Sequence, residues 1–115
     1  MRRSIECLRE NGVVCIIADQ REGETGVPVT FLGHPARAAA GPATLALRTG
    51  AALVPVFIHR CGDRKHRLEI LPAIEHERLG NLRVDVEQLT GKINAVIEKC
   101  ILEHPEQWWW LHRRW

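Results

Sequence analysis

Asp19 and Gln20 are the polar residues best placed to take part in chemistry, because they directly follow an unbroken apolar run at residues 13–18. Such a run is typical of a strand buried on both faces in a mostly parallel sheet. In open α/β sheets, ligands bind beyond the carboxyl ends of the strands, so this position predicts that both side chains line a substrate pocket. The alternative is that Asp19 only caps a turn.

Arg37, Gly33 and Gly41 form a second group of candidates for substrate binding. Arg37 precedes a helix expected to begin near Gly41, where a guanidinium and backbone N–H groups are suited to hold a phosphate. The open alternative is a solvated loop arginine. Gly33 and Gly41 permit a close approach of backbone to substrate, although loop glycines more often serve a turn. His34 lies in the same loop, and we interpret it as a surface residue.

The end of the chain combines aromatic and basic side chains: Trp108, Trp109, Trp110, His112, Arg113, Arg114 and Trp115. Such side chains favour the headgroup layer of a membrane, which predicts lipid contact by Trp108, Trp109, Arg113 and Arg114. They are also suited to recognise an anionic lipid. The other interpretation is that at least two tryptophans pack the tail onto the sheet. The two roles can coexist on different residues.

The elements that position these residues alternate between strand and helix, which predicts an α/β fold. Strands are expected at residues 13–18, 27–32, 51–58 and 67–74. Pro55 indicates an edge or a bulge in the third strand. Helices are expected at residues 4–11, 43–48 and 86–101, the last from apolar residues recurring every three or four positions.

Local signals mark the helix ends. Gly12 is expected to end the first helix and Gly50 the second. Asp85 is expected to cap the start of the last helix, and Pro105 to end it by disfavouring helical geometry at His104.

Composition narrows the class of protein. The 115 residues suffice for one compact unit, and a net charge of +2 is too weak to indicate nucleic-acid binding. No apolar stretch reaches the roughly 20 residues that span a bilayer. The four cysteines, without a Cys-x-x-Cys pair, fit a reducing compartment. We expect no metal ion and no cofactor.

Four segments together resemble the bacterial lipid A lauroyl and myristoyl acyltransferases, a branch of the lysophospholipid acyltransferase superfamily. They read GVVCIIADQ (residues 12–20), VTFLG (29–33), GPATLALRTGAALVP (41–55) and PEQWWWLHRRW (105–115). The last is the most specific, because it places many rare residues in a fixed order. The resemblance covers nearly the whole chain and corresponds to the C-terminal portion of the family's domain.

The resemblance implies transfer of a fatty acyl chain from an acyl carrier protein thioester to a hydroxyl of a lipid A precursor. This is a step of lipopolysaccharide biosynthesis at the cytoplasmic face of the inner membrane, where peripheral membrane contact is expected. The family's base is the histidine of a His-x-x-x-x-Asp motif. Here, the residues five positions after each histidine are not acidic, and His112 lies too near the end to have one.

We therefore expect residues 1–115 to form a single partial domain, an incomplete acyltransferase-type α/β sheet with flanking helices that lacks its N-terminal part. Its substrate-binding residues are expected to be present, its catalytic residues absent, and the chain inactive alone. The alternative is a non-catalytic module of the same fold that binds lipid or anions. Neither interpretation specifies the acyl chain length or the acceptor glycolipid.

Overall fold

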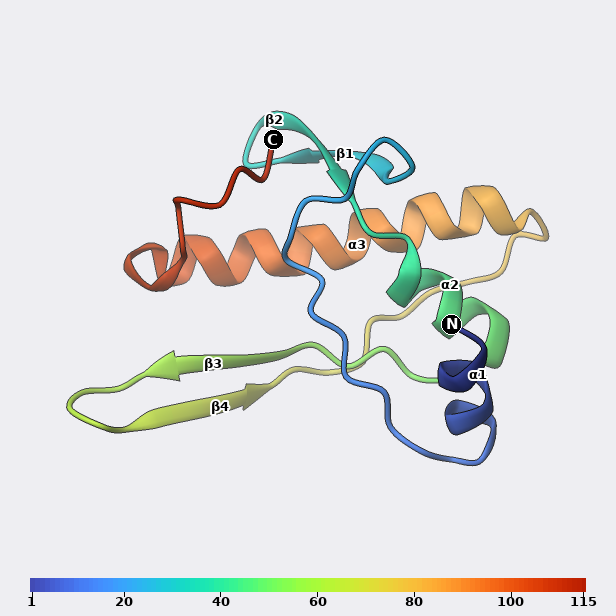
Figure 1. Cartoon of the computed structure of the whole chain (residues 1–115), viewed down its shortest axis with the longest axis horizontal. Helices are drawn as coiled ribbons and strands as arrows, with labels where there is room; N and C mark the ends of the chain where they lie inside the picture. Colours follow the sequence, from blue (N-terminus) through green and yellow to red (C-terminus); the bar gives the residue numbers. More distant parts are fainter.

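A computed structural model describes residues 1–115 and contains both helices and strands, which agrees with the expected α/β class (Figure 1). In chain order the elements are α1 (Arg2–Arg9), β1 (Val27–Phe31), β2 (His34–Ala38), α2 (Gly41–Thr49), β3 (Val56–Arg60), β4 (His66–Ile70), α3 (Leu82–Glu103) and the short 3-10 helix η1 (Pro105–Gln107). No helix is both long and apolar enough to cross a bilayer.

The hydrophobic core lies where α2, α3 and the β1–β2 hairpin meet. Helix α3 contributes four buried residues at steps of four positions: Leu89, Ile93, Ile97 and Ile101. This spacing places them on one face of the helix, as the periodicity predicts. The facing residues are Phe31 and Ala36 of the hairpin and Ala43, Ala46 and Leu47 of α2. The long helix in Figure 1 is therefore the element against which the rest of this core packs.

The β1–β2 hairpin confirms one predicted strand and adds one that the sequence analysis placed in a loop. Strand β1 corresponds to the strand expected at residues 27–32, and β2 pairs with it antiparallel, with Phe31 opposite His34. The turn residues Leu32 and Gly33 have φ values of 49° and 81°. Two successive positive φ values are typical of the two-residue turns that match the twist of a hairpin.

The expected parallel sheet is wrong. The two sheets are separate antiparallel hairpins, β1–β2 and β3–β4. Residues 13–18 do not form a strand, and run instead as a drawn-out connection between α1 and the first hairpin (Figure 1). The physical reason is that a strand requires a hydrogen-bonding neighbour, and no strand of these 115 residues pairs with this run. Apolar residues at 13–18 favour a strand, but they do not provide the neighbouring strand that it needs.

Strands β3 and β4 are shorter than the strands expected at residues 51–58 and 67–74. Strand β3 begins directly after Pro55, which lacks the N–H needed for a regular ladder. The pairing continues less regularly beyond it, since Leu71 N–H donates to the Pro55 carbonyl at 3.0 Å and Ile74 N–H to the Leu53 carbonyl at 2.9 Å. The predicted irregularity at Pro55 thus lies at the end of the strand.

The ends of α2 and α3 confirm two predicted signals and correct a third. Gly50 caps α2 with a φ of 75°, and α3 ends at Glu103 before His104 and Pro105. Asp85 does not cap α3, because the side chain of Asn81 accepts from the N–H groups of Arg83 and Val84. Asp85 instead is buried and accepts from the Leu79 N–H at 3.0 Å.

Helix α1 ends at Arg9, two residues before the expected end at Asn11. Asn11 takes the left-handed conformation with a φ of 62°, and its N–H donates to the Leu8 carbonyl. The Gly12 N–H donates to the Cys7 carbonyl at 2.8 Å, so the two bonds form a Schellman motif with asparagine in the usual glycine position. Gly12 is required for another reason, because a Cβ there would lie 2.6 Å from Cys7 Sγ and 2.8 Å from Cys7 O.

Candidate functional site

The polar loop that follows residues 13–18 lies against the edge of strand β2. Arg21 forms an isolated antiparallel bridge with Ala38, and the Glu22 N–H donates to the Arg37 carbonyl at 3.2 Å. These backbone contacts fix the position of the loop relative to the hairpin. Asp19 and Gln20 therefore lie beside the β1–β2 hairpin, not at the end of a strand.

The C-terminal tail reaches the same place. The Arg21 N–H donates to His112 Nε2 at 3.2 Å. The Arg114 guanidinium donates from Nη1 to the Arg37 carbonyl and from Nη2 to Asn94 Oδ1 of α3, both at 2.6 Å. The tail thus connects to the loop through His112, and to the hairpin and α3 through Arg114.

Arg114 is a fully buried cation with an exposed fraction of 0%. Burial lowers the pKa of its guanidinium from the usual value, while the negative charges of Asp19 and Glu98 oppose that shift. Its Cζ also lies 4.6 Å from the centre of the Phe31 ring, a cation–π distance. Because a buried charge is costly without partners, these contacts are what hold Arg114 in its charged form inside the protein.

Two polar atoms of this region have no hydrogen-bond partner within the chain. They are Asp19 Oδ1 and Arg114 Nε, and both are buried. The first is an acceptor and the second a donor. The charge of Asp19 acts on Arg114. A hydroxyl group, which both donates and accepts, is the kind of group that can pair with either atom.

The other predicted substrate-binding residues differ in how close they come to this pair. Gln20 is exposed, Gly33 lies in the hairpin turn, and Gly41 is the first residue of α2. Arg37 contributes its backbone carbonyl to the Arg114 contact. Its side chain points into the preceding loop, where Nη1 donates to the carbonyls of Glu24 and Gly26 at 3.0 and 2.8 Å.

Arg37 also lines an open groove of about 790 Å³. Arg48 of α2 and Arg83 of α3 line the same groove, which gives it three basic side chains. Glu24 and Glu87 line it as well, and Arg83 Nε lies 3.2 Å from Glu87 Oε1. The groove is therefore only weakly basic.

Some tail residues contact the core and others do not, and Trp115 belongs to the first group although it is 49% exposed. Trp108 and Trp115 lie with their ring centres 6.5 and 6.3 Å from that of Phe31, and Trp115 stacks on His34 at 5.7 Å. Trp109 is 72% exposed and Arg113 is exposed. Arg114 is buried, which is the opposite of the position that a headgroup contact requires. The expected lipid contact thus remains a prediction for Trp109 and Arg113.

Comparison with known proteins connects this geometry to a family. A sequence model of the family described as bacterial lipid A biosynthesis acyltransferase matches residues 1–115. The chain belongs to this family. The resemblance that the four sequence segments indicated is therefore confirmed.

The curated relatives of this chain are named as acyltransferases of different lipids. Phosphatidylinositol mannoside acyltransferase of Mycobacterium tuberculosis (strain ATCC 25618 / H37Rv) is 36% identical over 110 residues, which are 96% of this chain and 33% of that protein. Lipid A biosynthesis lauroyltransferase of Escherichia coli (strain K12) is 35% identical over 118 aligned positions, covering 99% of this chain and 37% of the relative. The chain spans about a third of the length of these relatives.

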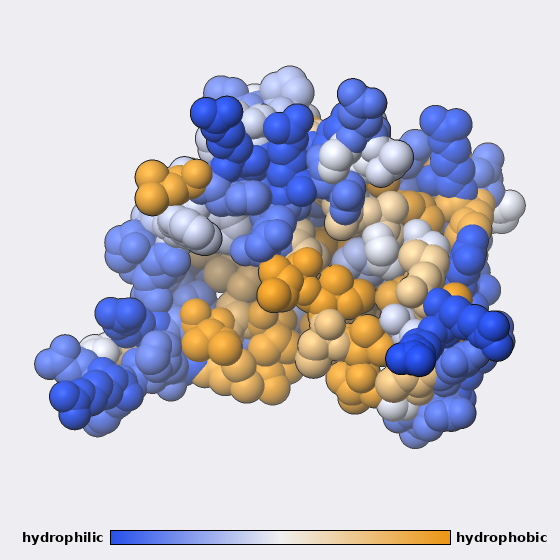
Figure 2. All heavy atoms as spheres, viewed as in Figure 1, coloured by the Kyte–Doolittle hydropathy of each residue, from blue (hydrophilic) through white to orange (hydrophobic).

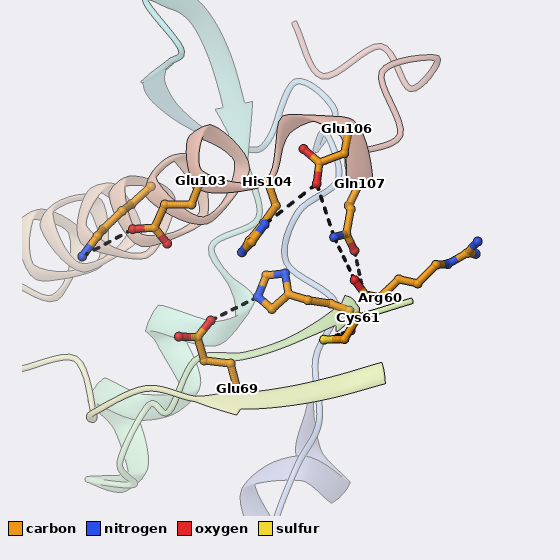
Figure 3. A network of polar contacts seen from close by, with 9 residues as sticks. Arg60, Cys61, Glu69, Glu103, His104, Glu106 and Gln107 are labelled. Atoms are coloured by element: carbon orange, nitrogen blue, oxygen red, sulfur yellow. Dashed lines mark hydrogen bonds and ion pairs between the residues drawn. The ribbon is translucent and has the colours of Figure 1, made fainter. Parts of the chain in front are cut away.

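The chain also places a histidine within hydrogen-bond distance of a carboxylate, although its sequence spacing does not suggest such a pair. His59 Nε2 of β3 lies 3.1 Å from Glu69 Oε2 of β4, and the His59 ring centre lies 4.3 Å from that of His104. Figure 3 shows Glu69 on its strand and His104 at the end of α3. His59 is 7% exposed and its ring connects β3 to β4 through Glu69, so the pair fits a structural role.

A second contact in the same region fastens the β3–β4 hairpin to the tail. Gln107 of η1 accepts from the Arg60 N–H at 2.7 Å and donates to the Arg60 carbonyl at 3.3 Å (Figure 3). No three His, Cys, Asp or Glu side chains are grouped in a way that would hold a metal ion. The network therefore serves to position the hairpin.

Sequence reasoning missed Asn94, His112 and Gln107. Asn94 had a signal, because a polar residue interrupts the apolar face of α3 at a position four residues after Thr90 and three before Ile97. Such a residue in a core needs a hydrogen-bonding partner, and here that partner is Arg114. His112 and Gln107 bind backbone groups of distant segments, which no local pattern indicates.

Proposed function

We propose that this chain is the acceptor-binding portion of an acyltransferase, which moves a fatty acyl chain from an acyl carrier protein thioester to a hydroxyl of a lipid A precursor or a related glycolipid. Membership of the family supports acyl transfer in general. The names of the relatives support a glycolipid acceptor, since one set acts on lipid A and another on phosphatidylinositol mannoside. The activity belongs to a longer assembly of which this chain corresponds to about a third.

The observation that carries the proposal is the pair of unpartnered atoms at Asp19 and Arg114. In the proposed complex, the acceptor hydroxyl donates to Asp19 Oδ1 and accepts from Arg114 Nε. Asn94 and the Arg37 carbonyl hold the guanidinium in place for this contact. Gln20, Gly33, Arg37 and Gly41 form the surrounding surface in this proposal.

The proposed chain lacks the base of the reaction. A hydroxyl needs a proton acceptor beside it to attack a thioester efficiently. No histidine of the chain has an acidic residue five positions later. We therefore propose that the chain alone does not transfer acyl groups, and that Trp109 and Arg113 contact the cytoplasmic face of the inner membrane.

A chimera tests the proposed function. The matched third of the Escherichia coli lauroyltransferase is replaced by this chain, and acyl transfer to a lipid A precursor is measured with the purified chimera. We expect activity in the chimera and none in the chain alone. Asp19→Asn in the chimera is expected to reduce kcat/KM by roughly 10- to 100-fold, the range for a lost hydrogen bond to a charged group.

Asp63→Asn provides the matched control, because Asp63 lies exposed in the β3–β4 turn and has no assigned contact. Its kcat/KM should equal that of the unmodified chimera. An inactive but folded chimera, or equal effects of the two substitutions, would contradict the proposal. Transfer by the isolated chain would also overturn it.

The groove lined by Arg37, Arg48 and Arg83 favours a second candidate, a non-catalytic module that binds anionic lipid. This alternative predicts an inactive chimera together with binding of the isolated chain to acidic vesicles. Charge reversal of Arg48 should weaken that binding, because Arg48 faces the groove and has no assigned carboxylate partner. Vesicle sedimentation distinguishes the two candidates.

A further inference from the structure

One face of the β3–β4 hairpin is apolar and open to solvent. Val56 pairs with Ile70 and Ile58 with Leu68, so the register brings all four side chains to the same face. Their exposed fractions lie between 50% and 66%. The alternate residues Phe57 and His59 point the other way, toward the core and η1. The hairpin thus has one covered face and one uncovered apolar face.

Residues 13–17 add to this open surface. Val13 and Ile17 are 84% and 80% exposed, and Ile16 is 44% exposed. We call the combined set the open apolar surface, and its members are Val13, Ile16, Ile17, Val54, Val56, Ile58, Leu68 and Ile70. Figure 2 shows apolar atoms gathered where, in Figure 1, the 12–20 connection crosses β3 and β4. An apolar patch of this kind marks an interaction site.

The backbone of residues 13–18 is also unpartnered. None of its N–H groups donates to a backbone carbonyl, and its one recorded acceptor contact is from Cys7 Sγ to the Val13 carbonyl at 3.7 Å. In addition, each hairpin strand pairs on one edge only. The open apolar surface therefore offers strand-like hydrogen-bonding groups together with apolar side chains.

These unpaired backbone groups decide between a membrane and a polypeptide as the occupant. Lipid tails provide no hydrogen bonds, and each unsatisfied backbone group in hydrocarbon costs several kcal/mol. A polypeptide that adds strands satisfies the backbone and covers the side chains at the same time. The open apolar surface thus fits a polypeptide partner.

The size of the open apolar surface and the length of the relatives indicate which polypeptide covers it. A second copy of the chain would pair with residues 13–18 along one edge, about a two-fold axis. The other edge of this segment and one of its two apolar faces would stay uncovered. The curated relatives, in contrast, are about three times as long as the matched region. They contain ample polypeptide to cover both.

We propose that the open apolar surface docks the polypeptide equivalent to the part of the relatives that this chain does not match, and that residues 13–18 become a strand within the joint sheet. The identity of this partner rests on the proposed function. In this arrangement the strand leads directly into Asp19, so docking places the acceptor-binding pair at the boundary between the two parts.

Co-purification tests the proposal. The full chain is expressed together with the unmatched part of the Escherichia coli lauroyltransferase carrying an affinity tag, and the amount retained is measured with the dissociation constant. Ile58→Lys places a charge on the hairpin face, and Ile17→Pro removes a backbone N–H that strand pairing requires. Leu102→Lys is the matched control, because Leu102 is 68% exposed on α3 outside the surface.

We expect the unmodified chain and Leu102→Lys to be retained equally, and each of the other two variants to bind at least roughly tenfold more weakly, as expected for a central interface residue. Circular dichroism confirms that all variants keep their helix content. Equal binding of all four chains, or no binding at all, overturns the proposal. So does a dimer that Ile58→Lys dissociates, or binding to neutral phosphatidylcholine vesicles that the same change abolishes.

The result of the co-purification experiment does not depend on whether the proposed function is correct. Retention requires docking but no acyl transfer, whereas the chimera assay measures transfer within a single polypeptide. An active chimera with no docking in the two-part experiment contradicts the open apolar surface only. Docking without activity in the chimera contradicts the proposed reaction only.

Discussion

Leu89 on α3 and Ile58 on β3 are similar side chains in opposite environments. Leu89 is 2% exposed and packs among residues of α2 and the β1–β2 hairpin, whereas Ile58 is 66% exposed. Both regions carry apolar residues at the spacing of their element, every four positions on the helix and every two on the strand. The comparison teaches that the chain provides two apolar layers and closes a core over only one of them.

Truncation of one residue in each region should give the largest difference. Leu89→Ala is expected to lower the free energy of unfolding by about 2–5 kcal/mol, because it removes buried contacts and leaves a cavity. Ile58→Ala is expected to change it by less than about 0.5 kcal/mol, as for an exposed position. Chemical denaturation followed by circular dichroism measures both values. Similar losses at the two positions would show that the hairpin face is covered in the isolated chain.

The C-terminal tail belongs to the closed region, because Arg114 is buried against α3 and the β1–β2 hairpin. Arg114→Met keeps the length of the side chain but leaves the Arg37 carbonyl and Asn94 Oδ1 without their donor. We expect a loss of about 1.5–3 kcal/mol, the range for hydrogen bonds to a charged group. Arg113→Met is the neighbouring control, and since Arg113 is exposed its effect should stay within about 0.5 kcal/mol. Equal losses of unfolding free energy for Arg114→Met and Arg113→Met in denaturation experiments would show that Arg114 does not have this structural role.

Two glycines, one in each region, should respond to alanine with opposite signs. Gly12→Ala places a Cβ 2.8 Å from the Cys7 carbonyl just before the open segment, so we expect a loss of about 1–3 kcal/mol from the overlap. Gly91→Ala lies within α3 with open space around the new Cβ, and it should stabilise the protein by about 0.5–1 kcal/mol. Thermal melting of the two variants gives the signs directly. A stabilising Gly12→Ala would contradict the Schellman geometry at the end of α1.

The closed region was the more predictable from sequence, for a physical reason. Helix α3 and its buried face follow from a periodicity that neighbouring residues define among themselves. The cap at Gly50 is equally local, since it depends on one residue that tolerates a positive φ. Strand β2 was missed because His34 and Pro35 are poor strand formers, and the pairing with β1 decides its conformation. The strand expected at residues 13–18 failed for the converse reason, because its residues favour a strand but have no partner.

The candidate site was predictable only in part. Asp19 stood out through its position after an apolar run, and the structure brings it to the region where the loop, the hairpin and the tail meet. Arg114, whose pKa the charge of Asp19 influences, lies near the other end of the chain, and its sequence position predicted lipid contact instead. Contacts between distant segments depend on the tertiary fold, so neither composition nor spacing reports them.

The smallest expected difference between the two regions is in the alkylation rate of one cysteine from each, Cys100 and Cys15. Burial raises the pKa of the Cys100 thiol on α3, and the nearby carboxylates of Glu69 and Glu103 raise it further. Cys15 lies exposed in the open segment. Because the thiolate is the reactive form, a raised pKa means a smaller thiolate fraction at any pH below it, and therefore slower alkylation.

We expect iodoacetamide to modify the exposed Cys15 before Cys100 between about pH 7 and pH 9. Peptide mass spectrometry of timed samples measures the two rates separately. Glu69→Gln should move the Cys100 profile toward lower pH, since it removes one of the two carboxylates, and should leave the Cys15 profile unchanged. If the docking partner covers residues 13–18 as proposed, its addition should slow Cys15 and leave Cys100 at its original rate, whereas equal slowing of both would place the partner over the hairpin end of α3 instead.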